Sequence, residues 1–267
     1  MDITVREADM QLVVDVGNTE SVVGVVRGDR DLIAHWRVSS TVPRTVDEMT
    51  VLLEALLRRA TSDRKALTGG VIGSVVPSTT YVWMDAVERL VHGPVVSVGP
   101  DSDLPIVLDV EEPLTVGADR IVNTLAAREL FARDTVAVDL GTATTYDCIT
   151  AEGVFLGGVI APGLSAGLDW LAARTAKLPR VEFAPPARVV GRRTEACIQS
   201  GVFYSVVDGV DGVVRRIKEE WERPDALVVA TGGYSKLLGP HLSTVDRVEP
   251  FLTLLGLAMA GRHLAGS

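Results

Sequence analysis

Asp15-Val16-Gly17-Asn18-Thr19 near the start of the chain and Asp139-Leu140-Gly141-Thr142-Ala143-Thr144-Thr145 near its middle are two copies of one short pattern. Each copy follows an apolar run, 12–14 or 136–138, and leads into another stretch typical of a strand. A carboxylate ends a buried strand, a glycine permits a tight turn, and hydroxyl and N–H groups face outward, a set that suits a phosphate chain and its metal ion. A hairpin turn alone explains either copy equally well. Because the pattern recurs after an equivalent strand, it predicts a nucleotide held from both sides.

The stretches around the first copy predict strands and helices in an α/β order. The Gly28-Asp29 pair indicates a hairpin between two β-branched-rich runs. Thr45 followed by Asp47 and Glu48 is typical of a capped helix N-terminus with an acidic first turn. The expected strands are Leu12–Val14, Val22–Val26, Leu32–Val38 and Gly69–Val76, and the expected helices are Thr45–Ala60 and Thr80–Val91.

The second half restarts this plan after a connection over 99–113 that is rich in Pro and Asp. The expected strands are 136–138, 145–150, 154–160 and 227–230, and the expected helices are 115–131, 165–175, 194–220 and 254–264. Both halves begin with a strand, a phosphate loop and a hairpin, which indicates an internal duplication. The sequence therefore predicts an α/β fold with two similar domains, 11–114 and 115–267. Each would have a mixed sheet flanked by helices, with a nucleotide cleft between the two.

Composition excludes several classes of function. Of the 267 residues, 47% are hydrophobic and 23% are charged, which is ordinary for a globular chain. The formal net charge is −9 and the Lys and Arg residues are scattered, so no basic face for nucleic acid is predicted. No apolar run approaches the ~20 residues of a membrane span, and Met1–Met10 has no signal-peptide pattern. We expect a cytoplasmic protein that binds neither nucleic acid nor membranes.

Cysteine and histidine usage predicts no metal centre built from these residues. Cys148 and Cys197 lie far apart in apolar contexts, and we expect both to be buried free thiols. The four histidines show no metal-ligand spacing. No pattern typical of a serine or cysteine nucleophile is present either.

Gly117-Ala118-Asp119-Arg120 begins the helix expected over 115–131. A carboxylate and a guanidinium beside a helix N-terminus form an anion-binding spot with a potential base. Phosphoryl transfer needs such a group to orient or deprotonate the acceptor hydroxyl, although an acidic first turn is favoured in any helix. Small residues at 157–163 and in Thr231-Gly232-Gly233 either bring the backbone close to a ligand or serve turns and packing.

Taken in order, these motifs resemble those of the type III pantothenate kinases, a family of the actin-like sugar-kinase superfamily with ribonuclease H-like domains. The resemblance covers about residues 11 to 264, and the order and spacing of the motifs carry it. The motifs are Asp15–Thr19, Thr45–Glu48, Gly117–Arg120, Asp139–Thr145, Gly157–Gly163, Gln199–Gly201, Thr231–Gly233 and Leu252–Leu254.

The resemblance implies ATP-dependent phosphorylation of pantothenate to 4'-phosphopantothenate, the first step of coenzyme A synthesis, by a homodimer that uses Mg²⁺ and a monovalent cation, K⁺ or NH₄⁺. It implies that Asp119 is the general base on the pantothenate hydroxyl, that Asp139 holds the monovalent cation and that Thr142 contacts ATP. The implied first phosphate loop consists of Asp15, Val16, Gly17, Asn18, Thr19, Glu20, Ser21 and Val22. The implied pantothenate site consists of Gly117, Ala118 and Arg120, with Thr194 reaching into the pocket of the neighbouring subunit.

Two positions depart from the family pattern, and both bear on the acceptor side. Val110 stands where the family usually has a Tyr that contacts pantothenate, and Gly191-Arg192-Arg193-Thr194 stands where it usually has Gly-Lys-Asn-Thr. Two alternatives remain: a catalytically silent nucleotide-binding relative with a regulatory role, and a kinase for another small alcohol. The intact Asp119 and Asp139 favour an enzyme, because a silent relative has no chemical reason to keep both.

Overall fold

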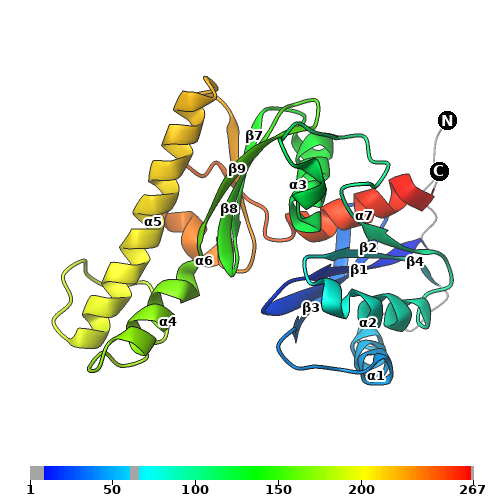
Figure 1. Cartoon of the computed structure of the whole chain (residues 1–267), viewed down its shortest axis with the longest axis horizontal. Helices are drawn as coiled ribbons and strands as arrows, with labels where there is room; N and C mark the ends of the chain where they lie inside the picture. The colour runs from blue at the N-terminus through cyan, green and yellow to red at the C-terminus, as the bar shows by residue number, and fades with distance from the viewer. Residues whose placement is uncertain (1–8, 61–65, 266–267) are drawn as a thin grey trace. The chain divides into compact units, whose positions relative to one another are not determined.

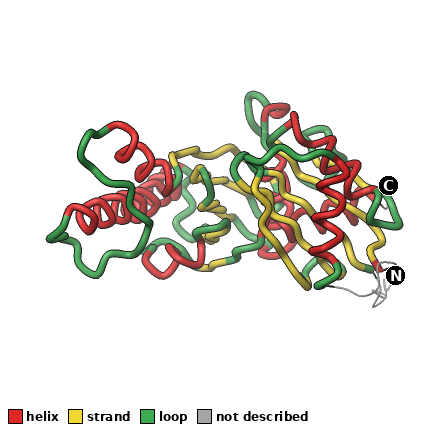
Figure 2. The backbone as a smooth tube through the Cα atoms, turned by 90° about the horizontal axis from the view of Figure 1, so that it is seen from below, coloured by secondary structure: helices red, strands yellow, loops and turns green. Residues whose placement is uncertain are grey.

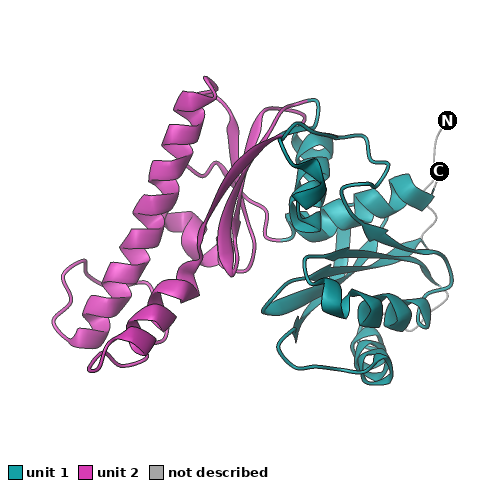
Figure 3. Ribbon diagram, viewed as in Figure 1, with its two compact units in different colours: residues 1–131, 152–155, 251–267 teal, residues 132–151, 156–250 magenta. Residues whose placement is uncertain are grey.

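The chain forms two compact α/β units, shown in teal and magenta in Figure 3. Unit 1 comprises residues 1–131, 152–155 and 251–267, and unit 2 comprises 132–151 and 156–250. The computed structural model describes residues 9–60 and 66–265. Most of the Met1–Met10 segment, for which the sequence predicts no signal peptide, lies outside the described residues. Among the described residues no helix is both long and apolar enough to cross a membrane.

Unit 1 is built on a five-stranded mixed sheet in the order β3-β2-β1-β4-β5. The antiparallel hairpins that join β1, β2 and β3 put β1 at the centre, where it also pairs in parallel with β4. Gly28 adopts a φ of +61° in the predicted turn between β2 and β3, a conformation that glycine adopts without steric cost. The strands are β1 Met10–Val16, β2 Glu20–Arg27, β3 Asp31–Ser39, β4 Leu67–Ser74 and β5 Val95–Val98.

Helices cover both faces of this sheet (Figure 1). Alternate residues of β1 point to opposite faces: Leu12, Val14 and Val16 pack with α1 and α2 in one core cluster, while Gln11 donates a hydrogen bond from Nε2 to the carbonyl of Ala258 in α7 at 3.0 Å. Asp15 therefore lies on the face that α3 and α7 cover. The helices are α1 Val46–Leu57, α2 Pro77–Glu88, α3 Ala118–Phe131 and α7 Leu252–Ala265.

Two helix starts in unit 1 test the sequence expectations. Thr45 and Glu48 form the predicted reciprocal cap of α1, with the Glu48 carboxylate accepting from the Thr45 N–H at 2.8 Å. The expected start of α2 at Thr80 was wrong, because the helix begins at Pro77. Proline suits the first position of a helix, where its missing N–H would have no intrahelical partner.

The second sheet has the order β11-β10-β7-β8-β9-β6. Its strands belong to unit 2, except for β6 and the first two residues of β9, which belong to unit 1. β7 pairs with β8 in antiparallel register and with β10 in parallel. The strand with Asp139 as its last residue but one therefore has the same kinds of neighbour as β1, which carries Asp15 at the corresponding position. The strands of this sheet are β6 Val107–Leu108, β7 Thr135–Leu140, β8 Ala143–Ile149, β9 Val154–Pro162, β10 Leu227–Thr231 and β11 Arg247–Val248.

One long helix covers one face of this sheet. Phe203, Val207 and Val210 of α5 pack with Val136, Val138 and their neighbours in a second core cluster. α4 lies along α5, and the segment 175–193 between them carries neither helix nor strand (Figure 2). The helices of unit 2 are α4 Leu164–Arg174, α5 Thr194–Glu220 and the short α6 Ser235–Leu238.

Several short elements and one chemical detail differ from expectation. The sequence did not predict β5, β6, β11 or the 3₁₀ turns Pro113–Thr115 and Gly239–His241, which are two to four residues long and carry too little periodicity to detect. Both cysteines are free as expected. Neither is buried, because Cys148 is half-buried and Cys197 is exposed on α5.

Asp211 anchors α5 to the loop before β11. Its carboxylate accepts hydrogen bonds from the backbone N–H groups of Ser243 at 2.9 Å and Thr244 at 3.0 Å, and from both hydroxyls. Burial alone would raise the pKa of Asp211, but these four hydrogen bonds outweigh it and hold the pKa below its ordinary value. The ionised carboxylate therefore stabilises unit 2.

Asp211→Asn is expected to lower the free energy of unfolding by about 1–3 kcal/mol at pH 7, because an amide cannot accept from all four donors. Because the folded-state pKa is depressed, the stabilisation is complete above the ordinary carboxyl pKa of ~3.9 and is lost as the pH falls through the lower folded-state value. Urea unfolding at several pH values measures both effects. Asp208→Asn, at an exposed position one turn earlier, is the control, and an equal loss in that variant would contradict the role given to Asp211.

Candidate active site

The first phosphate loop is a tight turn at the carboxyl end of β1. Asp15 is half-buried, and Gly17 leads into the exposed Asn18 and Thr19. A Cβ atom at position 17 would lie 2.6 Å from the carbonyl oxygen of Glu20, so the turn can close only around glycine. The loop thus brings the Asp15 carboxylate and the exposed side chains of Asn18 and Thr19 together at the carboxyl end of β1.

The structure places the remaining residues of that predicted loop in different roles. The side chain of Val16 is in the core, so only its backbone is available to a ligand. The buried Ser21 hydroxyl lies 2.8 Å from that of Ser40, Val22 is half-buried, and the exposed Glu20 pairs with Arg37 at 2.8 Å. A phosphate could therefore be reached by side chains from positions 15, 18 and 19.

The second phosphate loop, in unit 2, is enclosed by two glycines. Gly141 and the exposed Thr142 connect β7 to β8. A Cβ at Gly163 would collide with the carbonyl oxygens of this loop, and one at Gly232, which has a φ of +86°, would collide with the Asp139 carboxylate. The glycines that the sequence left ambiguous thus make room for the loop.

Asp119 begins α3 at the same edge of unit 1 as the first loop. Asp15 is the register partner of Gly73 in β4, and a Cβ at Gly73 would lie 3.5 Å from that of Ala118. Ala118 is buried, so its packing over Gly73 sets the start of the helix. A Cβ at Gly117 would lie 2.5 Å from a carboxylate oxygen of Asp119. A side chain at position 117 would therefore crowd the Asp119 carboxylate.

The environment of Asp119 is that of a candidate base. Burial raises the pKa of Asp119 above its ordinary value, against the opposing effects of a hydrogen bond from the Arg120 N–H at 2.9 Å and of the Arg120 charge. A half-buried carboxylate with a raised pKa at a helix N-terminus is a functional candidate rather than an ordinary surface acid.

Arg120 and Val110 meet through Phe155. The Arg120 guanidinium carbon lies 4.8 Å from the centre of the Phe155 ring, a cation–π contact. The N–H of Asp109 donates to the carbonyl of Phe155 at 2.9 Å, which holds the half-buried Val110 in the same neighbourhood. Unit 1 thus brings together Val110, Gly117, Ala118, Asp119 and Arg120. Thr194 belongs to unit 2, where it is the exposed first residue of α5.

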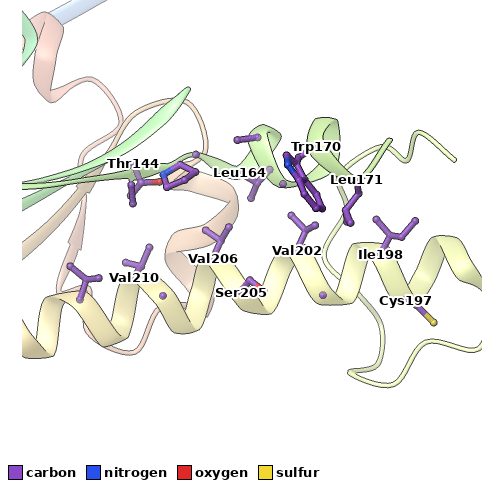
Figure 4. A pocket seen from close by; sticks show the side chains of 18 of the residues that line it. Thr144, Leu164, Trp170, Leu171, Cys197, Ile198, Val202, Ser205, Val206 and Val210 are labelled. Carbon is purple, nitrogen blue, oxygen red and sulfur yellow. The ribbon is translucent and has the colours of Figure 1, made fainter. Parts of the chain in front are cut away.

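Sequence reasoning did not predict an apolar groove that unit 2 contains. It has a volume of about 980 Å³ and lies between α4, α5 and β8. Figure 4 shows Val202 and Val206 of α5 pointing toward Leu164 and Trp170 of α4. On α5 its small residues recur every four positions, at Gly201, Ser205 and Gly209, a spacing that could have revealed one helix face.

No multi-ligand metal centre is present among the described residues, because no three His, Cys, Asp or Glu side chains gather there. Asp15 and Asp139 each supply one carboxylate, a group that can bind a cation together with hydroxyls, carbonyls and a bound phosphate chain.

Comparison with known proteins gives one consistent result. Residues 11–216 match the family model described as type III pantothenate kinase. The chain is 44% identical over 249 residues to the type III pantothenate kinase of Moorella thermoacetica, covering 93% of this chain and 97% of that one. It is 43% identical over 251 residues to the one from Frankia alni, covering 94% and 98%.

Solved structures extend the likeness to the fold. A ROK family glucokinase from Streptomyces griseus, in complex with glucose and AMPPNP, is 14% identical with a TM-score of 0.55, covering 95% of this chain and 99% of that chain. A putative Baf family transcriptional activator from Campylobacter jejuni is 16% identical with a TM-score of 0.57, covering 94% and 98%. At these identities the likeness concerns the fold alone.

Asp119→Asn is expected to raise the Tm at pH 7 by about 2 °C or more. The substitution removes a charge whose burial destabilises the fold by about 1 kcal/mol. Because burial raises the pKa of the folded state, the ionised form destabilises the fold above that pKa, and the difference disappears below the ordinary value of ~3.9. Calorimetry at about pH 7 and about pH 3, on either side of the ordinary carboxyl pKa of ~3.9, measures it, with the exposed Asp103→Asn as the control for net charge. A lower Tm for Asp119→Asn than for the parent at pH 7 would show that burial of the Asp119 charge does not destabilise the fold.

Proposed function

The chain belongs to the type III pantothenate kinase family, and from this we infer that it transfers the γ-phosphoryl group of ATP to pantothenate. The product is 4'-phosphopantothenate, the first intermediate of coenzyme A synthesis. The observation that carries the reaction type is the coincidence of family membership with two predicted phosphate loops and a half-buried carboxylate of raised pKa at a helix N-terminus.

Asp15 to Val22 and Thr142 are proposed to hold ATP. The turn at Gly17 leaves the backbone of residues 17–19 next to the Asp15 carboxylate, a combination that suits phosphate oxygens together with a metal ion. Mg²⁺ is usually held by one or two carboxylates plus substrate phosphates rather than by an all-protein cage. Asp15 fits that role, since it is half-buried and directly precedes the loop.

Asp119 is proposed to be the general base. In the loose transition state of phosphoryl transfer the acceptor hydroxyl keeps its proton until late, so a carboxylate need only accept the proton as the new bond forms. The hydrogen bond from the Arg120 N–H fixes the carboxylate. Its raised pKa makes it a stronger base than an exposed aspartate.

Gly117, Ala118, Arg120 and Val110 are proposed to line the pantothenate site. They lie around Asp119 in unit 1, where Arg120 stacks on Phe155 and the segment of Val110 bonds to the same residue. Val110 offers less contact area than the tyrosine usual in the family. The pocket has no space-filling aromatic ring at that position, so substrate affinity depends more on the polar groups.

Asp139 is proposed to hold a monovalent cation, K⁺ or NH₄⁺. Its single carboxylate lies against Gly232, where a side chain would collide with it. One carboxylate neutralises one monovalent charge, and neutral oxygens can complete the coordination of K⁺. A cation bound there would offset phosphate charge in a chain whose net charge is −9.

The groove on unit 2 supports a homodimer, with a second copy of this chain as its occupant. Trp170 at its edge is 62% exposed, and an apolar groove of this size is a marker of an interaction surface. Cβ atoms at Gly201 and Gly209 would meet nothing within 4 Å, so a partner helix could approach α5 closely there. Thr194 lines the same groove, so a partner seated on it would lie next to Thr194.

The division into duplicated halves, 11–114 and 115–267, is also proposed. It rests on the shared order of strand, phosphate loop and hairpin in β1–β2 and β7–β8, with Asp15 and Asp139 at equivalent positions. α3 and α7 come after residue 114, yet both pack with unit 1.

Asp119→Asn is expected to lower kcat about 10²–10⁴-fold, the usual contribution of a general base, while ATP binding measured by calorimetry stays near that of the parent. In the parent, activity should be lost as the pH falls through the raised pKa of Asp119, so the acid limb of the kcat/KM profile should lie above pH ~3.9. Product formation with ATP, Mg²⁺, K⁺ and pantothenate is the readout. Unchanged turnover in the variant would remove Asp119 from the mechanism, and a parent that binds ATP without pantothenate-dependent turnover would be a silent relative.

Gly209→Leu and Gly201→Leu are expected to shift the protein from dimer to monomer, as measured by light scattering at micromolar concentration. Neither side chain meets an atom of its own chain at Cβ, so the fold of the monomer should be kept, as circular dichroism would show. Arg215→Leu, at an exposed position on α5 outside the groove, is the control. If both glycine variants stay dimeric, the groove is not the interface.

A further inference from the structure

The Thr231 hydroxyl is buried at the end of β10 without a hydrogen-bond partner among the described residues. Other fully buried hydroxyls in the chain are satisfied: those of Thr124, Thr135 and Ser235 each donate to a backbone carbonyl, at 2.7–2.8 Å. An unsatisfied buried hydroxyl costs about 1–3 kcal/mol. A valine would fill the same volume without that cost. The presence of a hydroxyl at position 231 therefore indicates that its oxygen binds a ligand.

The register places this hydroxyl beside Asp139. Thr231 is the partner of Asp139 in the parallel pair β10–β7, and neighbouring strands lie about 4.8 Å apart. The residues before them, Ala230 and Val138, belong to the core cluster under α5. Side chains alternate along a strand, so Thr231 and Asp139 share the opposite face.

A third oxygen side chain completes a row across the sheet. Thr145 of β8 is the partner of Asp139 on its other side, and it is half-buried. The row Thr231, Asp139, Thr145 holds one carboxylate between two hydroxyls, with Gly232 packed directly against the carboxylate. A set of oxygen donors with a single negative charge suits a hard cation of low charge, rather than a transition metal that prefers nitrogen or sulfur ligands.

We propose that Thr231 Oγ1 is a direct ligand of the monovalent cation held at Asp139, so that Thr231-Gly232 forms part of the cation site. This inference rests on the proposed role of Asp139. A cation ligand at Thr231 needs the hydroxyl oxygen. A purely structural role in packing β10 would need only the methyl group.

The test is the response of the protein to K⁺ at constant ionic strength, with tetramethylammonium chloride as the replacement salt. Two readouts are taken: the K⁺-dependent rise in Tm with ATP present, and the K⁺ concentration for half-maximal phosphorylation. In Thr231→Val both should need about tenfold more K⁺ or more, within the 10–100-fold loss usual when a metal site is perturbed. Thr231→Ser, which keeps the oxygen, should restore the response.

Thr135→Val is the matched control, because it removes a buried hydroxyl from β7 at the other end of its pairing with β10. It should lower stability without moving the K⁺ response. If Thr231→Val responds to K⁺ as the parent does while Asp139→Asn does not, the inference is wrong and the role of Asp139 stands. If the parent shows no response to K⁺, both are wrong.

A second measurement needs no variant. Crystals of the parent soaked in Tl⁺, which substitutes for K⁺, should show an anomalous peak in direct contact with both Thr231 Oγ1 and the Asp139 carboxylate. A peak at Asp139 with a water molecule on Thr231 would overturn the inference even if Thr231→Val failed to fold.

Discussion

A carboxylate that ends a buried strand, followed by a turn around glycine, is the constraint on which the rest of the site depends. In unit 1 the turn closes at Gly17 because any side chain there would meet the backbone of Glu20. In unit 2 the corresponding carboxylate, Asp139, is seated against Gly232. Each sheet thereby presents one acidic side chain beside a glycine turn at the carboxyl end of a strand, the end at which open α/β sheets bind ligands.

Close helix packing fixes the position of Asp119, the proposed base, at this edge of unit 1. α3 can begin over β4 because Gly73 leaves space for Ala118, and α3 crosses α7 where a side chain at Gly256 would collide with the Val122 carbonyl. The Thr253 hydroxyl donates to Asn123 at 3.0 Å across the same helix pair. These packing contacts, which lie away from the proposed reacting groups, thus fix the position of Asp119. They also impose the burial that raises the pKa of its carboxylate.

Much of this could be predicted from sequence, for reasons that are local. The long strands and helices follow from apolar periodicity, and the cap of α1 follows from Thr45 and Glu48 alone. β5 escaped because a four-residue strand between Pro94 and Gly99 has too few residues for a period. The roles of Gly163 and Gly232 could not be decided, because glycine serves turns and ligand approach alike. The small-residue face of α5 became evident only when α4 was seen beside it.

The proposed mechanism requires the pantothenate hydroxyl to lie beside Asp119. A crystal structure with pantothenate and a non-hydrolysable ATP analogue is the decisive measurement. We expect the primary hydroxyl oxygen of pantothenate within about 2.6–3.2 Å of a carboxylate oxygen of Asp119, with Gly117, Ala118 and Arg120 around it. Pantothenate bound elsewhere, or its hydroxyl turned toward Asp15 or Asp139 with Asp119 out of reach, would contradict this mechanism.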